Sequence, residues 1–276
     1  MNGHISASQL NCLLQCGEAY RRRYVLRETL PPTISLIRGL SFHRMAEKNN
    51  KQKIKTKQDL SFGDLRIHAA YEVEKFFDGE MMLKKEDYHR GVDIIKNETI
   101  ESIISTIDIF LELNRNVNPI EVESQQDILL PDGTKIRYVM DVEIENGIID
   151  YKFTGKKKTQ RAVDEDSGLT IYALAYFAKN SKMPEIIQFN NFVSYHTQKK
   201  RELKSDGIIL NSTRTVKDFE IILDRINMAI KSIKSDVFLP APVGAWNCSP
   251  DWCGYFSTCK YVNYERICAA EAQEQE

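Results

Sequence analysis

The sequence contains no long apolar stretch. No hydrophobic run approaches the roughly 18 residues that a membrane-spanning helix requires, so we expect no membrane span and no membrane partner. The first residues, Met1 to Ser6, also lack the basic and apolar segments of a signal peptide. We therefore expect a cytoplasmic protein.

The chain also lacks an excess of either charge. Its 38 Lys and Arg and 39 Asp and Glu give a net charge of -1, so any nucleic-acid interface must be a local patch. No Walker-type phosphate-binding loop is present, and an ATP-driven motor would therefore have to be another chain. The hydrophobic content of 42% is ordinary for a globular protein.

Two apolar runs flank Asn146-Gly147, a dipeptide typical of tight hairpin turns. We expect antiparallel strands over residues 135–144 and 147–153. Asp141 lies on the first strand, and Asp150 and Lys152 point to the same face of the second. Two carboxylates beside an ammonium suit a hard divalent cation, Mg²⁺ or Mn²⁺, next to a reacting water or phosphate. The alternative is a pair of solvated strand faces, although aspartate is uncommon inside strands.

The pattern of apolar residues predicts a mixed α/β chain. We expect a mainly helical region over residues 1–115, a sheet core over 116–210, and a helix followed by a tail over 211–276. The expected helices cover residues 6–20, 34–54, 64–77, 86–113, 169–179 and 215–233. Further strands are expected at 120–130, 186–195 and 202–210.

Six cysteines in a cytoplasmic chain suggest metal ligands or free thiols rather than disulfides. Cys248, Cys253 and Cys259 lie in a tail rich in proline, glycine and aromatic residues. A metal site of four thiolates needs one more ligand, from Cys16, Cys12 or Cys268. Their spacing does not separate zinc from iron–sulfur, and scattered buried thiols are the alternative.

Three basic segments are candidate phosphate contacts: residues 21–23, 51–57 and 156–161, the last directly after Lys152. Tyr172, on the helix that follows, could stack on a base, with core packing as the alternative. The residues that we expect to bind nucleic acid are Arg21, Arg22, Arg23, Lys156, Lys157, Lys158, Arg161 and Tyr172.

These motifs resemble the PD-(D/E)XK nuclease superfamily and, within it, the RecB-like iron–sulfur exonucleases of the CRISPR-adaptation type, which include phage proteins. A helical histidine in a G-x-x-x-H context comes first in that family, and Gly39-Leu40-Ser41-Phe42-His43 matches it. A lone helical histidine would otherwise be weak support for a site. Asp141 and then Asp150-Tyr151-Lys152 match the later motifs. The resemblance covers roughly residues 6–260.

The resemblance implies a restriction-endonuclease-like fold, with a mixed sheet flanked by helices in a single nuclease domain over residues 1–276. His43, Asp141, Asp150 and the backbone carbonyl of Tyr151 would hold the cation, and Lys152 would orient or activate water. It also implies a [4Fe-4S] cluster, which joins the N-terminal region to the tail; zinc is the alternative. Its ligands would be Cys16, Cys248, Cys253 and Cys259.

The implied activity is a metal-dependent DNA nuclease, an exonuclease on single-stranded DNA or frayed ends. A recombination protein, a helicase or a CRISPR integrase would be its partner, in the host cytoplasm if a phage encodes the chain. Many relatives carry Q-L-x-x-Y after the D-x-K strand, whereas Gly168 stands at the glutamine position here. The alternative is therefore a weak or inactive DNA-end-binding iron–sulfur module in a phage recombination or CRISPR-related complex.

Overall fold

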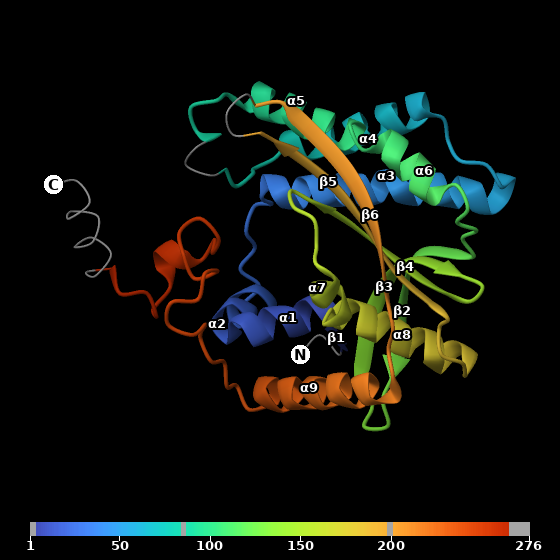
Figure 1. The fold of residues 1–276 in the computed structure, drawn as a ribbon. Helices are drawn as coiled ribbons and strands as arrows, with labels where there is room; N and C mark the ends of the chain where they lie inside the picture. Colours follow the sequence, from blue (N-terminus) through green and yellow to red (C-terminus); the bar gives the residue numbers. More distant parts are fainter. Residues whose placement is uncertain (1–3, 84–86, 198–200, 265–276) are drawn as a thin grey trace.

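A six-stranded mixed sheet forms the centre of the computed structural model, which describes residues 4–83, 87–197 and 201–264 (Figure 1). Its strands follow the order β1-β3-β4-β5-β6, and β2 pairs with β3. The β1–β3 and β4–β5 pairs are parallel and the others antiparallel. The strands are β1 (His4–Ser6), β2 (Glu121–Leu129), β3 (Lys135–Ile144), β4 (Gly147–Thr154), β5 (Ile186–His196) and β6 (Leu203–Ser212).

Helices cover both faces of the sheet (Figure 1). On one face lie α3 (Ile34–Thr56), α4 (Phe62–Phe77), α5 (Val92–Ile104) and α6 (Ile107–Asn114). On the other lie α1 (Ala7–Gln15), α8 (Ser167–Asn180) and α9 (Val216–Lys234). Each face has its own buried apolar cluster. The short elements are α2 (Gly17–Tyr20), the π-helical turn η1 (Arg21–Val25), α7 (Gln160–Asp164) and the 3-10 turn η3 (Phe256–Thr258).

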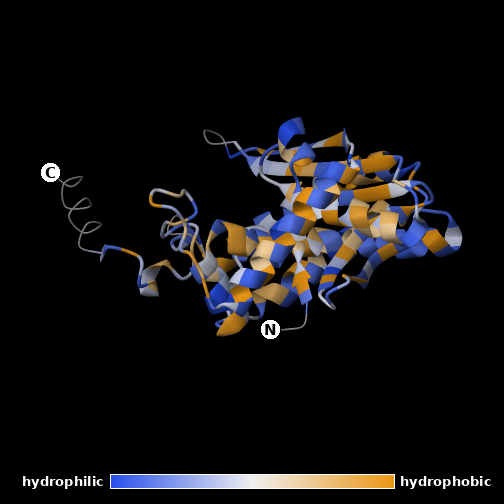
Figure 2. Cartoon of the chain, turned by 90° about the horizontal axis from the view of Figure 1, so that it is seen from below, coloured by the Kyte–Doolittle hydropathy of each residue, from blue (hydrophilic) through white to orange (hydrophobic). Residues whose placement is uncertain are grey.

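The amphipathic pattern of residues 215–233 forms α9 as predicted. Thr215 caps its first turn through a capping box with Asp218. One face of the helix is buried against the sheet side, and the rest is exposed and mainly polar, apart from Val216, Ile221 and Met228. Figure 2 shows hydrophilic and hydrophobic residues interspersed along the helices. The buried face carries Phe219, Ile222, Ile226 and Ile230. No helix in the described ranges is long and apolar enough to cross a membrane.

Two predicted helices are each divided in the structure. The expected helix over residues 6–20 stops at Cys16, whose backbone is extended, with φ of -162° and ψ of 106°. The expected helix over 86–113 becomes α5 and α6, and residue 86 lies outside the described residues. The hydroxyls of Ser105 and Thr106 donate to the carbonyls of Ser102 and Ile103 at this break. Such local bonds compete with a continuous helix.

The predicted hairpin exists, and its strands end at residue 144 and begin again at residue 147 as expected. Ile144 pairs with Gly147, so Glu145 and Asn146 form the loop and Gly147 opens β4. Gly147 is required by a close approach, because a Cβ atom there would lie 2.1 Å from the carbonyl oxygen of Ile186. The short parallel strand β1 was not predicted.

Strands β3 and β4 part at Asp141, and this separation creates the site. Val142 still pairs with Ile149, whereas the start of β3 pairs with β1 instead. Met140 and Val142 are two residues apart and would share a face in a regular strand, but they belong to the apolar clusters on opposite faces of the sheet. The alternation of side chains along β3 is therefore interrupted at Asp141. At this point the backbone N–H and C=O groups of β4 have no partner on β3 and can form hydrogen bonds with side chains instead.

Candidate active site

Asp141 takes the place of the missing strand pairing. Its Oδ2 accepts a hydrogen bond of 2.6 Å from the backbone N–H of Tyr151. The side chain is buried, and burial alone would raise its pKa. The charge and hydrogen bond of His43 and the charge of Lys152 outweigh burial and lower the pKa of Asp141 below its usual value. Asp141 is therefore held as a carboxylate.

His43 reaches this carboxylate from α3. Its Nδ1 lies 3.5 Å from Asp141 Oδ1 and 3.4 Å from Glu123 Oε1. Burial opposes the charged ring, but the charge of Asp141 and hydrogen bonds to Asp141 and Glu123 raise the pKa of His43 to about 10. His43, Glu123 and Asp141 each offer a ligand atom within 4.8 Å of the others, which is a spacing that suits one metal ion.

Glu123 was not predicted. It lies opposite Asp141 in the β2–β3 ladder, between the pairs Val122–Val142 and Ser124–Met140. Its φ is +49°, a left-handed conformation that costs a non-glycine residue roughly 1–2 kcal/mol. Strained backbone of this kind is concentrated at functional sites. The hairpin centred on Asp132 sets this register, and it is the sequence signal from which Glu123 could have been found.

Asp150 and Lys152 form the second half of the site, on the face predicted for them. Lys152 Nζ lies 2.6 Å from Asp150 Oδ1 and donates to the carbonyl of Tyr151 at 3.2 Å. Burial, partly offset by the charge of Lys152, raises the pKa of Asp150 to about 7. Burial opposes the ammonium, but Asp150 and Asp141 raise the pKa of Lys152 further, so Lys152 stays charged.

One oxygen of Asp150 is unused. Its Oδ2 is buried and accepts no hydrogen bond from the part of the chain that the structure describes. A buried acceptor without a partner is uncommon, and a bound cation would satisfy it. Asp150 is nevertheless outside the group of His43, Glu123 and Asp141, which alone meets the 4.8 Å spacing among the described residues.

The family model of the PD-(D/E)XK nuclease superfamily matches residues 4–260. The chain belongs to the PD-(D/E)XK nuclease superfamily. No curated protein sequence shows a significant match to it. The mixed sheet flanked by helices agrees with the restriction-endonuclease-like fold of that superfamily. Its members are typically metal-dependent nucleases, which accords with the carboxylates, histidine and lysine gathered where β3 and β4 part.

Helix α8 follows the site strand β4 in the fold, and the charge of Asp166 at its start acts on Asp150. Asp166 caps α8 by accepting from the N–H of Leu169 at 2.9 Å. Tyr172 is partly buried against the core, and burial and the charges of Asp150 and Asp141 raise its pKa well above the usual value. Gly168 offers no side chain to this region. A Cβ atom there would lie 3.0 Å from Asp166 Oδ1.

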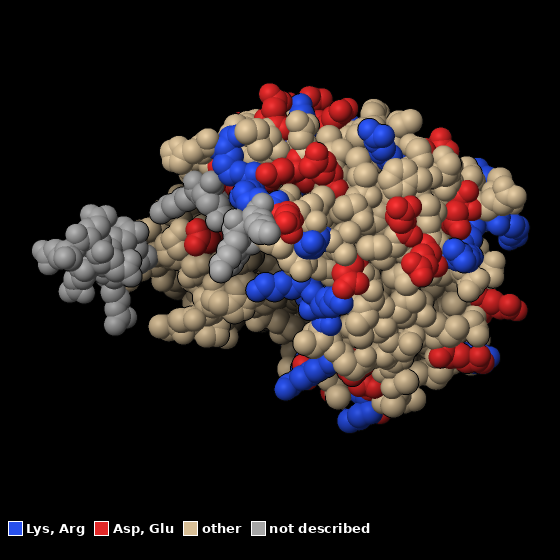
Figure 3. Space-filling view, turned by 45° about the horizontal axis from the view of Figure 1, so that its top comes forward, with Lys and Arg blue, Asp and Glu red and all other residues tan. Residues whose placement is uncertain are grey.

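Most of the predicted DNA-binding cations have acidic partners. Arg21 pairs with Glu18 at 2.9 Å, Lys157 pairs with Asp206, and Arg161 lies in α7, where it pairs with Glu165 at 2.9 Å. Arg22 binds Glu28 and stacks on Tyr255, and Arg23 lies over Tyr24. Lys156 and Lys158 have no acidic partner within the described ranges. Lys and Arg are interspersed with Asp and Glu on the face in Figure 3.

One of the lysines in residues 51–57 is buried. Lys53 is 4% exposed, and its ammonium is used within the protein. The prediction that the whole segment contacts phosphate is therefore wrong for Lys53. Lys51 pairs with Glu47 on the exposed side of α3.

The tail cysteines lie around one cavity with the cysteines of the N-terminal region. The cavity has a volume of about 1380 Å³, and Cys268 lies outside the described residues. Cys16 caps α2, with its Sγ accepting from the N–H of Ala19 at 3.4 Å, and the next residue, Gly17, donates to the carbonyl of Leu239 at 2.6 Å. The described cysteines that line the cavity are Cys12, Cys16, Cys248, Cys253 and Cys259.

The described cysteines around this cavity do not form a compact group of three ligands. No three of the described cysteines have sulfurs within 4.8 Å of one another. Zinc–sulfur bonds of about 2.3 Å place tetrahedral sulfurs roughly 3.8 Å apart, so no three of the described sulfurs are arranged as zinc ligands. Burial is the main cause that raises the pKa of Cys12 to about 11, which disfavours its thiolate.

Proposed function

We propose that this protein is a metal-dependent DNA nuclease that acts as an exonuclease on single-stranded DNA or frayed ends. The observation that carries the proposal is that two pairs of charged side chains, His43–Asp141 and Lys152–Asp150, meet where β3 and β4 separate. His43 Nδ1 and Asp141 Oδ1 are 3.5 Å apart, close enough to bind one cation together. Lys152 is held by Asp150 and the carbonyl of Tyr151. Superfamily membership supports hydrolysis of phosphodiester bonds.

The ligands proposed for Mg²⁺ or Mn²⁺ are His43, Asp141, Asp150 and the carbonyl of Tyr151, with Glu123 as a further neighbour. The buried, unpaired Oδ2 of Asp150 fits this role. A cation held there would polarise a phosphoryl oxygen and lower the pKa of a bound water.

The other residues of the site orient the reaction. Lys152 stays charged and, held by Asp150, would orient the attacking water and stabilise negative charge on the phosphate. Lys156 and Lys158 follow β4 directly and would contact the DNA backbone. We propose Arg21, Arg22, Arg23, Lys157, Arg161 and Tyr172 as further DNA contacts, with the pairs described above rearranged on binding.

We also propose that Cys16, Cys248, Cys253 and Cys259 hold a [4Fe-4S] cluster. Their position around a common cavity supports this ligand set. Because Cys16 and Cys259 are far apart in the sequence, a cluster between them would constrain a long loop and stabilise the fold. Brown colour and absorption near ~400 nm after anaerobic purification support the cluster, whereas a colourless protein with stoichiometric zinc contradicts it.

A second candidate is a DNA-end-binding module with little or no catalysis. The absence of a side chain at Gly168 favours it, because the amide present in many relatives is missing beside the carboxylates. A helicase, a recombination protein or a CRISPR integrase would then supply the remaining chemistry.

End-labelled single-stranded DNA of both polarities separates the two candidates. We expect Mg²⁺- or Mn²⁺-dependent degradation by the wild type and a loss of at least roughly 100-fold in Lys152→Met. Lys179→Met is the matched control, since Lys179 pairs with Glu121 and Glu143 away from the reacting group. A wild type that binds DNA ends but is inert with both ions would leave the binding module as the function.

A further inference from the structure

Tyr151 contributes its backbone to the site and its side chain to the opposite face of the sheet. Its N–H binds Asp141 and its carbonyl accepts from Lys152. The phenol is 2% exposed and packs in the apolar cluster under α3 to α6. The hydroxyl therefore has no access to DNA or to a reacting water.

That hydroxyl is held from two directions. It donates to Asn114 Oδ1 at 2.7 Å and accepts from Asn50 Nδ2 at 3.1 Å. Asn114 Nδ2 in turn donates to Asn50 Oδ1 at 2.9 Å. Each of the three side chains therefore bonds to both others, and all are buried. A closed polar ring in an apolar core fixes one arrangement, because any displacement leaves a buried group unpaired.

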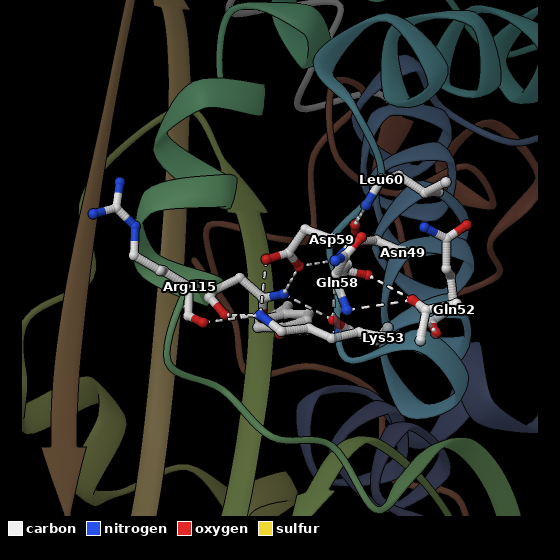
Figure 4. Close-up of polar contacts among 11 residues, drawn as sticks. Asn49, Gln52, Lys53, Gln58, Asp59, Leu60 and Arg115 are labelled. Atoms are coloured by element: carbon white, nitrogen blue, oxygen red, sulfur yellow. Dashed lines mark hydrogen bonds and ion pairs between the residues drawn. The ribbon is translucent and has the colours of Figure 1, made fainter.

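The ring is hydrogen-bonded to the ion pair between Asp59 and Lys53. Asp59 Oδ1 accepts from Asn114 Nδ2 at 3.0 Å and from Asn49 Nδ2 at 2.7 Å. Lys53 binds Asp59 Oδ2 at 2.8 Å and also donates to the carbonyls of Asn114 and Arg115 at the end of α6 (Figure 4). Asn49 Oδ1 accepts from the N–H of Leu60, which completes the link to the start of α4 (Figure 4).

The same helix supplies the metal ligand and the ring. His43 and Asn50 are seven residues apart on α3, two helical turns, and so lie on one side of it. The ring therefore fixes where Tyr151, and with it β4, lies relative to α3. This placement determines how far His43 lies from Asp141 and from the carbonyl of Tyr151.

We propose that Tyr151, Asn50 and Asn114, anchored by Asp59 and Lys53, are positioning residues that set the ligand geometry of the cation site. The proposal rests on the cation site assigned under the proposed function. Mg²⁺ demands near-ideal octahedral geometry, whereas Mn²⁺ accepts a looser set of ligands. Loosening the ring weakens the binding of both ions, and that of Mg²⁺ more.

The test is the affinity of the full-length protein for Mn²⁺, followed by the spectroscopic signal of the free ion, with Mg²⁺ as competitor. Tyr151→Phe removes only the hydroxyl. The matched control is Tyr176→Phe, because Tyr176 is also buried, at 4% exposed, and its hydroxyl donates to the carbonyl of Glu145 at 2.8 Å. We expect Mn²⁺ to bind Tyr151→Phe roughly 10-fold more weakly, Mg²⁺ to compete less well, and the control to match the wild type.

Asn50→Ala breaks the ring from α3 and is expected to give the same pattern, so one unstable variant does not decide the outcome. Equal Mn²⁺ affinity in the wild type and Tyr151→Phe overturns the proposal. So does an equal loss in Tyr176→Phe, since that loss would reflect general destabilisation. A wild type that binds no Mn²⁺ refutes the cation site itself and, with it, this inference.

Discussion

Among the glycines that the structure describes, Gly147 is the one at which an added methyl group is expected to destabilise the protein most. A Cβ atom there would lie 2.1 Å from the carbonyl oxygen of Ile186 and 2.7 Å from its Cβ. The contact is with backbone, so no side-chain rotation relieves it. Gly147→Ala must therefore move the start of β4 away from β5, and β4 carries Asp150 and Lys152.

The magnitude follows from the contacts that such a shift disturbs. Overpacking a close-packed interior costs about 1–3 kcal/mol. The N–H groups of Glu185 and Ile186 both bind the carbonyl of Asn146, at 2.8 and 3.1 Å, and each lost bond costs about 1 kcal/mol. We expect Gly147→Ala to lower the free energy of unfolding by about 3–5 kcal/mol.

Urea unfolding of the two alanine variants Gly147→Ala and Gly155→Ala measures this. Gly155 follows β4 directly, and nothing lies within 4 Å of a Cβ atom placed on it. Gly155→Ala is therefore expected to stay within about 0.5 kcal/mol of the wild type. A loss under about 1 kcal/mol for Gly147→Ala would refute the close approach of β4 to Ile186 and the geometry of the hairpin built on it.

Three further predictions concern ligands and protons. Cys16→Ser is expected to lower iron content and thermal stability together, whereas Cys12→Ser should leave both at the wild-type level. Iron analysis and thermal melting measure the two quantities. The reverse result would make Cys12, and not Cys16, the cluster ligand. The pKa of His43 is raised from 6.5 to about 10, so in the metal-free protein its stabilising charge is complete below pH 6.5 and lost as the pH rises through about 10. Unfolding by urea with a chelator at several pH values checks this, and His43→Gln should flatten the profile. Glu123→Gln removes a charged ligand and should weaken Mn²⁺ binding roughly 10-fold by calorimetry; unchanged affinity would remove Glu123 from the site.

The sequence carried the parts of the site that depend on local pattern. The spacing of Asp150 and Lys152 on one strand, and the turn before them, are short-range features, and the structure places their side chains in contact. Superfamily membership of residues 4–260 is confirmed. The amphipathic helix that ends in Lys234 was also found from its period alone.

Other features depend on contacts between distant segments. Glu123 joins His43 only through the register of a hairpin, and β1 is three residues long, too short for any periodic signal. Lys53 belongs to a basic segment of the kind that contacts phosphate, but its ammonium donates to the carbonyls of Asn114 and Arg115 at the end of α6. The close approach of Gly147 to Ile186 also joins segments far apart in the sequence, so no local pattern indicates it.

The central claim is that the point where β3 and β4 part is a cation site that hydrolyses DNA. The most direct measurement is the rate of Mg²⁺-dependent degradation of labelled single-stranded DNA by Asp150→Asn and Asp127→Asn. Asp127 lies on β2, exposed and paired with Arg137 at 2.9 Å, so its variant changes a carboxylate of the same sheet outside the site. We predict loss of degradation in Asp150→Asn and the wild-type rate in Asp127→Asn. Equal rates in the two variants would contradict the claim.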